Sequence, residues 1–411
     1  MDVLDRFKAN VKKSRENGCI SLLDGVPHET KLKPCEVIIK KAMNGLLHAN
    51  VDANKTFSYG PEQGDAEFRH EVAKFLSQQY DSTVNSENLI LTAGATHGVH
   101  LLTSVLFGRG THCFIENPTY FAMQRALKDD LHMNVIPVKT DSHGIDVEDL
   151  DRLLTEQKPQ DIPNDMIYWA CVYTVPVYNN PRGLSYSPET CKALIKCARK
   201  HKVLIICDDV YNLLCYDSKH PPQRLFSYDN PTDSDYYGNV VSNGSFTKIL
   251  MPGIRVGWIE APPIIVNRLV HSSLTFSGGS FNHFGGQIVT EILKLDLLAP
   301  HLEFLKENYA KNMKIIIDTL NTVPHLKFIK PGGGFFIWVE IPNDNVDALE
   351  FLTQAVDNRT VSFIPGQCTS PTGEFSNCVR LSVAKEPDYR VKEGIETFVD
   401  QYKRLMDKEQ S

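Results

Sequence analysis

The feature that most constrains the fold is an alternation of short β-rich runs with helical patterns between residues 88 and 260. Several runs are almost continuously apolar, as in strands covered on both faces. The segments between them repeat apolar residues every three or four positions, as residues 188–201 do. This alternation predicts a mostly parallel sheet with helices on both faces. The seven predicted strands are residues 88–92, 112–116, 134–139, 166–173, 203–207, 239–242 and 256–260.

The last third of the chain has a different pattern. Residues 301–321 predict one long helix, residues 335–340 a strand after three glycines, and residues 388–406 a helix with one apolar face. This part is therefore expected to form a smaller α+β domain.

A chain of 411 residues is too long for one ordinary core. We predict a three-layer αβα large domain with a mostly parallel seven-stranded sheet at residues 49–298. A smaller domain at residues 299–411 follows it, and an N-terminal arm at residues 1–48 contributes to the smaller domain.

Charge and composition exclude several classes of protein. The 43 basic and 50 acidic residues give a net charge of −7, which argues against a nucleic-acid partner. No apolar run approaches the ~20 residues that span a bilayer, so no membrane partner is expected. Ten scattered cysteines without a Cys-x-x-Cys pair, and a start without an apolar signal, predict a cytoplasmic protein. No His/Asp cluster has metal-ligand spacing, so no metal is expected.

The segment at residues 245–258 carries the strongest chemical signal. Lys248 follows a predicted strand, with Ser245 close before it and Arg255 seven residues after it. Hydroxyls and a guanidinium suit a phosphate, and a lysine beside a phosphate suits a Schiff base with pyridoxal 5'-phosphate. The segment resembles the lysine signature of the class I/II aminotransferases, which are pyridoxal-phosphate enzymes of fold type I. The overall pattern is most similar to the broad-range branch that acts on aromatic and 2-aminoadipate-type amino acids.

The resemblance assigns residues around the pyridine ring. It places Asp208 on the ring nitrogen, where a carboxylate keeps the nitrogen protonated, and Asp209 is a rival by one position. It places Tyr211 and Asn180, from Asn-Pro-Arg-Gly, on the ring phenolate oxygen. In this reading Lys248, Asp208 and Tyr211 are the catalytic residues.

Further matches follow the family order along the chain. The resemblance puts the cofactor phosphate on Ala95 and Thr96, together with Ser245 and Arg255, and stacks Tyr120 on the ring.

Other matches concern the substrate and a second copy of the chain. Arg380 is matched to the arginine that grips the substrate carboxylate, with Gly25 and Asn180 lining the substrate pocket. Tyr59 is matched to a tyrosine that crosses a dimer interface to the neighbour's phosphate, which implies a homodimer with shared active sites.

These matches imply a ping-pong aminotransferase that moves an amino group from an L-amino acid to a 2-oxo acid such as 2-oxoglutarate. A β-lyase on the same scaffold and a non-catalytic amino-acid sensor are the alternatives. A sensor of this kind is expected to carry a DNA-binding domain before Ile20. Only about 20 residues precede Ile20, which is too few for such a domain. Arg182 and the pair Gln367-Cys368 depart from the family pattern, and His97 receives no role. No Gly-x-Gly-x-x-Gly follows a strand, which disfavours a nicotinamide enzyme.

Overall fold

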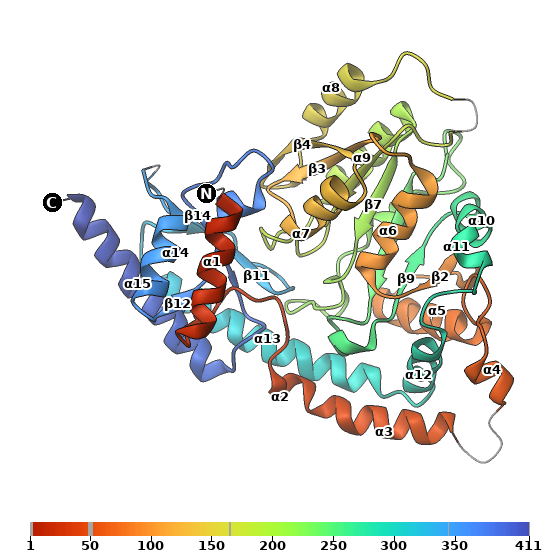
Figure 1. Cartoon of the computed structure of the whole chain (residues 1–411), viewed down its shortest axis with the longest axis horizontal. Helices are drawn as coiled ribbons and strands as arrows, with labels where there is room; N and C mark the ends of the chain where they lie inside the picture. Colours follow the sequence, from red (N-terminus) through yellow and green to blue (C-terminus); the bar gives the residue numbers. More distant parts are fainter. Residues whose placement is uncertain (1–2, 48–51, 164–165, 344, 411) are drawn as a thin grey trace.

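The computed structural model describes residues 3–47, 52–163, 166–343 and 345–410, so the predicted boundary between residues 48 and 49 lies outside the described residues. A large part built on one sheet lies beside a smaller part that holds both ends of the chain (Figure 1). Within the described ranges, no helix is long and apolar enough to cross a membrane. The division into domains stays a prediction.

The central sheet has the strand order β2-β9-β8-β7-β6-β3-β4-β5. Strands β4, β3, β6, β7 and β8 run parallel to one another, whereas β9 is antiparallel to both of its neighbours. The predicted α/β class with a mostly parallel sheet is confirmed. The strands are β2 (Leu89–Thr92), β3 (His112–Asn117), β4 (Asn134–Asp141), β5 (Gly144–Ile145), β6 (Ala170–Thr174), β7 (Leu204–Asp208), β8 (Val240–Ser245) and β9 (Gly257–Glu260).

Two details of the sheet differ from the expectation. The two-residue strand β5 adds an antiparallel edge to the seven longer strands. Strand β6 begins at Ala170 rather than at Met166. The antiparallel direction of β9 follows from its connection to β8, because residues 246–256 are too few for the helical crossover that a parallel strand needs.

Alternating strand residues enter two separate cores. Ile205 in β7 packs in the core against α8 and α9, whereas its neighbour Ile206 packs in the core on the opposite face. In β6, Val172 and Tyr173 divide in the same way. Both faces of the sheet are therefore covered, which gives three layers. The helices of this part are α4 (Ala53–Phe57), α5 (Ala66–Tyr80), α6 (Ala95–Leu106), α7 (Phe121–Arg125), α8 (Val147–Gln157), α9 (Pro188–His201), α10 (Pro263–Val270), α11 (Ser273–Phe276) and α12 (His283–Lys294).

Local sequence explains where these helices begin and end. Ser187 caps α9 by accepting from the Thr190 N–H, Pro188 fills its first turn, and Lys202 ends it in a left-handed conformation.

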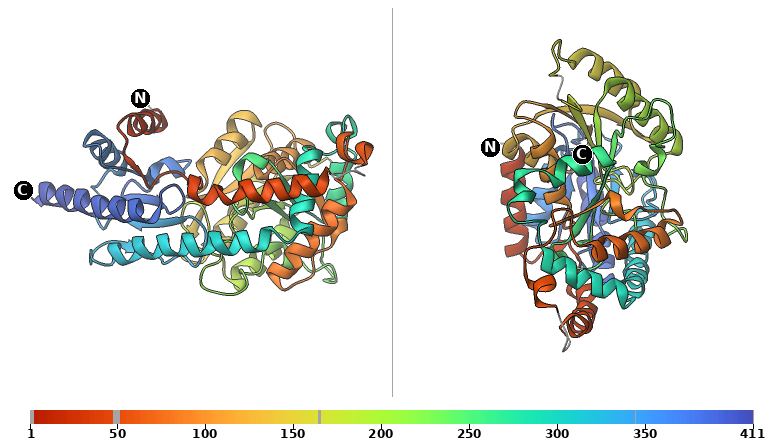
Figure 2. Two further views of the ribbon diagram at one scale, coloured as in Figure 1. Left: turned by 90° about the horizontal axis from the view of Figure 1, so that it is seen from below. Right: turned by 90° about the vertical axis from the view of Figure 1, so that its right-hand side faces the viewer.

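The smaller part combines an antiparallel sheet with long helices. The sheet has the order β10-β11-β14-β13, and β1 pairs separately with β12. The strands are β1 (Ile20–Ser21), β10 (Lys327–Phe328), β11 (Phe336–Glu340), β12 (Val361–Ser362), β13 (Ile364–Pro365) and β14 (Cys378–Ser382). The helices are α1 (Val3–Glu16), α2 (Glu29–Leu32), α3 (Pro34–Leu46), α13 (Leu298–Leu320), α14 (Ala348–Asp357) and α15 (Asp388–Gln410). Helix α13 extends from the large part into the smaller part, alongside α3 in the view from below (Figure 2).

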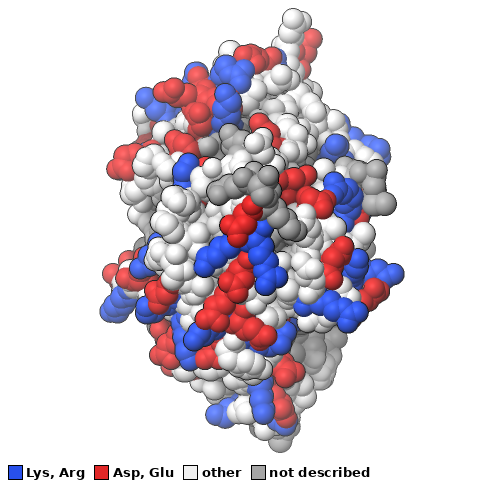
Figure 3. Space-filling view, turned by 90° about the vertical axis from the view of Figure 1, so that its left-hand side faces the viewer, with Lys and Arg blue, Asp and Glu red and all other residues white. Residues whose placement is uncertain are grey.

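The N-terminal segment is fixed to the smaller part by pairing and by charge. Strand β1 pairs with β12, and Arg6–Glu350 and Lys13–Asp357 ion pairs join α1 to α14. Acidic and basic side chains are interspersed over this end of the molecule (Figure 3).

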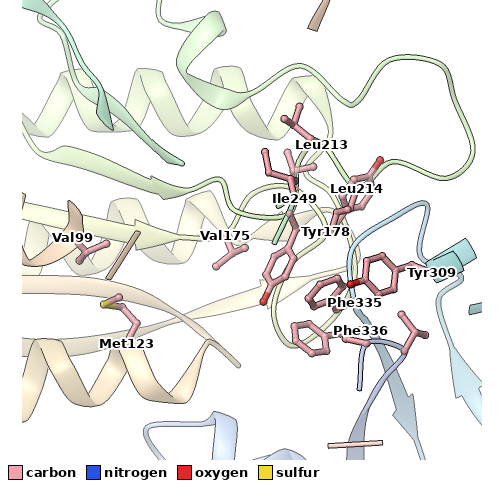
Figure 4. Close-up of a cluster of buried hydrophobic side chains, with 14 of the residues drawn as sticks. Val99, Met123, Val175, Tyr178, Leu213, Leu214, Ile249, Tyr309, Phe335 and Phe336 are labelled. Carbon is pink, nitrogen blue, oxygen red and sulfur yellow. The ribbon is translucent and has the colours of Figure 1, made fainter. Parts of the chain in front are cut away.

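An aromatic cluster joins the two parts next to the sheet ends. Phe335 and Phe336 of the smaller part lie beside Tyr309 of α13 and face Tyr178 and Ile249 of the large part (Figure 4). The rings of Phe335 and Tyr309 are 4.8 Å apart. This contact places the smaller part over the ends of the central strands.

Candidate active site

One cavity collects most of the predicted site residues. It offers about 170 Å³ of space and lies at the carboxyl ends of β6, β7 and β8, where ligands of open α/β sheets bind. The predicted residues that line it are Ala95, Thr96, Tyr120, Asn180, Asp208, Tyr211, Ser245, Lys248 and Arg255. Thr247, one of the hydroxyls beside Lys248 that suit a phosphate, lines the cavity as well, and so do Val175 and Val210, which carry no predicted role although each lies within two residues of a strand end.

Lys248 lies in the loop after β8 and reaches across the cavity. Its Nζ donates to the carbonyl oxygen of Gly25 at 2.9 Å and lies 5.5 Å from the centre of the Phe335 ring. Burial lowers the pKa of Lys248 to about 8, and the nearby positive charges of Arg380 and Arg255 act in the same direction, while Asp208 opposes them. A substantial fraction of the amine is therefore neutral, and nucleophilic, just above neutral pH.

The structure separates the two rival aspartates. Asp208 ends β7 and lines the cavity, and its Oδ2 accepts from the Tyr173 hydroxyl at 2.7 Å. Its Oδ1 is buried without a hydrogen-bond partner among the described residues. Asp209 instead accepts from the Ser242 hydroxyl and does not line the cavity. Burial raises the pKa of Asp208 to about 6.

Asn180 connects Tyr211 to Arg380 through hydrogen bonds. Its Oδ1 accepts from Arg380 Nη1 at 2.9 Å, and its side chain lies within hydrogen-bonding reach of the Tyr211 hydroxyl. Tyr211 itself is buried and packs edge-on against Phe335 and Phe336.

The opposite end of the cavity is built to receive an anion. Gly94 precedes α6 with a φ of +95° and no side-chain cap, so the first backbone N–H groups of the helix are free of a capping side chain. A Cβ at Gly94 would lie 2.8 Å from Arg255 Nη2, so only glycine lets the guanidinium approach this closely. Arg255 is held by a hydrogen bond from its Nη1 to Thr247 Oγ1 at 3.1 Å.

Arg380 in β14 is 3% exposed and has no carboxylate partner among the described residues. Besides Asn180, its Nη2 donates to the carbonyl oxygen of Leu23 at 2.6 Å, and its guanidinium lies 3.9 Å from the centre of the Phe336 ring. Burial lowers the pKa of Arg380 to about 10. Gly25 is two residues after Leu23, so one segment bonds to both Arg380 and Lys248.

Tyr59 is the one predicted cofactor residue that does not line its own cavity. Its side chain is 85% exposed and lies next to Gly278. The structure of one copy of the chain therefore does not bring Tyr59 to the other site residues.

The departures from the family pattern have structural partners. Arg182 donates to Thr140 and to the carbonyl of Asp141, and Gln367 donates to Asp347. His97 accepts from the Ala93 N–H and packs on Phe281.

Outside the cavity, the structure brings Asp151, Cys197 and His201 within 4.8 Å of one another. This trio has no spacing signal in the sequence, because Asp151 and Cys197 are 46 positions apart. Lys200 occupies both carboxylate oxygens of Asp151 at 2.7 and 2.8 Å, so an ion pair accounts for the cluster.

The donor set fits pyridoxal phosphate. The unpartnered Asp208 oxygen suits a protonated ring nitrogen, and the open helix start with Arg255 suits a phosphate. Lys248 lines the same cavity as Asp208 and Arg255.

Comparisons with known proteins agree with this chemistry. The model of the family described as aminotransferase class I and II matches residues 18–398. The chain is 27% identical to aromatic-amino-acid aminotransferase 1 of Thermococcus litoralis, over 95% of this chain and 89% of that one. It is 24% identical to 2-aminoadipate transaminase of Thermus thermophilus, over 94% and 90% of the two chains.

A solved structure gives the same result. The crystal structure of Pyrococcus horikoshii kynurenine aminotransferase superposes with a TM-score of 0.84 at 25% identity, covering 97% of this chain and 94% of that one. The chain therefore belongs to the class I and II aminotransferase family, and it is a transaminase with pyridoxal phosphate as its cofactor.

Proposed function

We propose that this transaminase moves the amino group of an aromatic or 2-aminoadipate-like L-amino acid to a 2-oxo acid such as 2-oxoglutarate, with Lys248 as the catalytic lysine. The observation that carries the proposal is the position of the Lys248 amine in a cavity with a free carboxylate oxygen at one end and a guanidinium at the other. The two named relatives act on amino acids of these kinds, as their names state.

The cofactor supplies a carbonyl carbon that takes the amino group and a ring that delocalises the electrons of the broken Cα–H bond. Lys248 would remove the proton from substrate Cα as a base and deliver it, as an acid, to the cofactor carbon that takes the amino group, for which a pKa of about 8 is well matched. Asp208 holds the proton on the ring nitrogen.

The other residues bind and orient. Arg380 binds the substrate carboxylate through its two-pronged guanidinium, and Asn180 and Tyr211 donate to the ring oxygen. Tyr120 covers the ring and excludes water. Ala95, Thr96, Ser245 and Arg255 hold the phosphate, and Gly25 lines the substrate pocket.

A donor panel tests the reaction and the substrate together. The purified holoenzyme is expected to convert aromatic or 2-aminoadipate-type donors with 2-oxoglutarate, giving 2-oxo acids and glutamate with ping-pong kinetics. Lys248→Ala should abolish turnover and the visible absorbance of lysine-bound cofactor, whereas Lys200→Ala on the surface should change neither. Release of pyruvate and ammonia without amino transfer would identify a β-lyase instead.

We also propose that the functional unit is a homodimer. Exposed aromatic side chains occur in the same segments as Tyr59 and its neighbour Gly278: the exposed fractions are 58% for Phe57, 80% for Phe276 and 40% for Phe284, and the Phe57 ring packs against Phe284. A cluster of large apolar side chains in water is typical of an interface. In this arrangement Tyr59 of one protomer completes the phosphate site of its partner.

Mixing two inactive variants tests the shared site. Lys248→Ala and Tyr59→Ala each damage every site in their own homodimer, but a mixed dimer contains one site with both residues intact. We expect activity to return after the two are unfolded and refolded together. No recovery, or a monomer by light scattering, would contradict the proposal.

The cytoplasmic location and the absence of a nucleic-acid partner belong to the same proposal. All ten cysteines are free thiols in the structure, which supports a reducing compartment.

A further inference from the structure

Tyr173 is a fully buried residue next to the proposed cofactor site. It lies one residue before the end of β6, in the middle of the central sheet, and none of its surface is exposed. It pairs with Ile206 of the neighbouring strand β7, two residues before Asp208. Its hydroxyl donates to Asp208 Oδ2 at 2.7 Å.

This hydrogen bond leaves one carboxylate oxygen of Asp208 for the cavity. Among the described residues, Tyr173 provides the only side-chain donor to Asp208, and no lysine or arginine forms an ion pair with it. Because Oδ2 is fixed by Tyr173, the carboxyl group cannot rotate freely, and Oδ1 stays without a partner. The hydroxyl thus selects which oxygen is offered to a ligand.

The same bond opposes the cost of burying a negative charge. Burial raises the pKa of Asp208, and the neighbouring charge of Asp209 raises it further, whereas the bond from Tyr173 and the charge of Lys248 lower it. A hydrogen bond donated to a charged carboxylate is stronger than a hydrogen bond between two neutral groups, so the Tyr173 hydroxyl favours the ionised form of Asp208.

We propose that Tyr173 is a positioning residue, whose hydroxyl keeps Asp208 ionised and directs its free oxygen toward the ring nitrogen of the cofactor. This inference rests on the proposed role of Asp208. Tyr173 itself makes no contact with the substrate in this proposal.

Cofactor affinity tests the proposal without any turnover. Tyr173→Phe removes one oxygen and keeps the ring. Titration of the cofactor-free protein with pyridoxal phosphate, followed by absorbance, should show about tenfold weaker binding. Tyr168→Phe is the matched control, because Tyr168 is equally buried and its hydroxyl bonds to the Gly238 carbonyl outside the cavity. It should lose a similar amount of thermal stability and keep wild-type affinity.

A double-variant cycle shows whether Tyr173 acts through Asp208. In an Asp208→Asn background, Tyr173→Phe should weaken binding little further, since the carboxylate it serves is absent. Equal losses in both backgrounds would overturn the proposal.

The pH dependence of cofactor binding distinguishes this role from a purely structural one, because a purely structural role would leave the pH at which binding is lost unchanged. Binding requires ionised Asp208, so it should fall as the pH falls through the pKa of that residue. Loss of the donor raises this pKa, so the acidic edge of the binding curve should move upward by about one pH unit in Tyr173→Phe. An unmoved edge would overturn the proposal.

A wild-type protein that binds the cofactor but transfers no amino group would instead contradict the proposed function, and the binding tests would still decide the role of Tyr173.

Discussion

Two arginines, each 3% exposed, differ in the charge of their hydrogen-bond partners. Arg224 donates from Nε and Nη2 to the two carboxylate oxygens of Glu260, at 2.9 and 2.8 Å. Among the residues that the structure describes, Arg380 donates to neutral groups only, the amide oxygen of Asn180 and the carbonyl oxygen of Leu23.

The difference separates an arginine whose charge is paired within the fold from an arginine whose charge is available to a ligand. Burial lowers the pKa of Arg224, but the charge and hydrogen bond of Glu260, together with Tyr80 and Asp209, more than reverse this, so the pKa of Arg224 is raised overall. Burial of Arg380 is not reversed, and its pKa falls to about 10. The fold supplies the anion for Arg224, whereas Arg380 has no anion among the described residues, which supports its proposed role as the partner of a substrate carboxylate.

The largest expected effect comes from breaking the completed pair. Arg224→Met leaves Glu260 buried without its cation, so the free energy of unfolding should fall by about 3–5 kcal/mol. Chemical denaturation measures the loss. Arg224→Met with Glu260→Leu should recover most of it, and a double variant as unstable as the single one would contradict the comparison.

A smaller effect on stability, with a large effect on binding, is expected at the other arginine. Arg380→Gln removes a buried charge that has no anion, so the protein should be as stable as wild type or more stable. The kcat/KM values for amino acid and 2-oxo acid should both fall about 100-fold, because each substrate loses its carboxylate partner. A loss of stability matching that of Arg224→Met would remove the distinction.

The smallest effect extends the comparison to carboxylates. The pKa of Asp208 is raised from 3.8 to about 6, so the folded, cofactor-free protein binds more protons than the unfolded chain between these values. Stability therefore falls as the pH rises through this window, and ionised Asp208 is destabilising at pH 8. Asp208→Asn should stabilise the cofactor-free protein at pH 8 by about 1–3 kcal/mol. This gain should vanish below about pH 4, whereas Glu260→Gln should be destabilising at pH 8.

Local patterns were sufficient to predict the sheet from the sequence. The apolar run at residues 112–116 ends one residue before the observed β3, and the run at residues 203–207 is shifted by one residue from β7, because strands buried on both faces need continuous apolar sequence. Direction was harder to predict. Nothing local in residues 256–260 marks β9 as antiparallel, since that depends on the short connection before it.

The same limit applies to the site. Lys248 and Asp208 can be proposed from the sequence alone, because both lie in short motifs at strand ends. The hydroxyl of Tyr173 cannot be found in this way, because its partner is 35 residues away and its side chain is typical of a core residue. Partners brought together by neighbouring strands leave no spacing signal in one sequence.

The contact between Lys248 and the Gly25 carbonyl links the beginning of the chain to its chemical centre. The same short stretch also receives Arg380 at Leu23 and the Ser382 hydroxyl at Asp24. A lysine that forms a covalent bond to the coenzyme gives up this tether. Binding of the coenzyme should therefore loosen the segment around Gly25, and we expect the amide hydrogens of that segment to exchange with solvent faster in the holoenzyme.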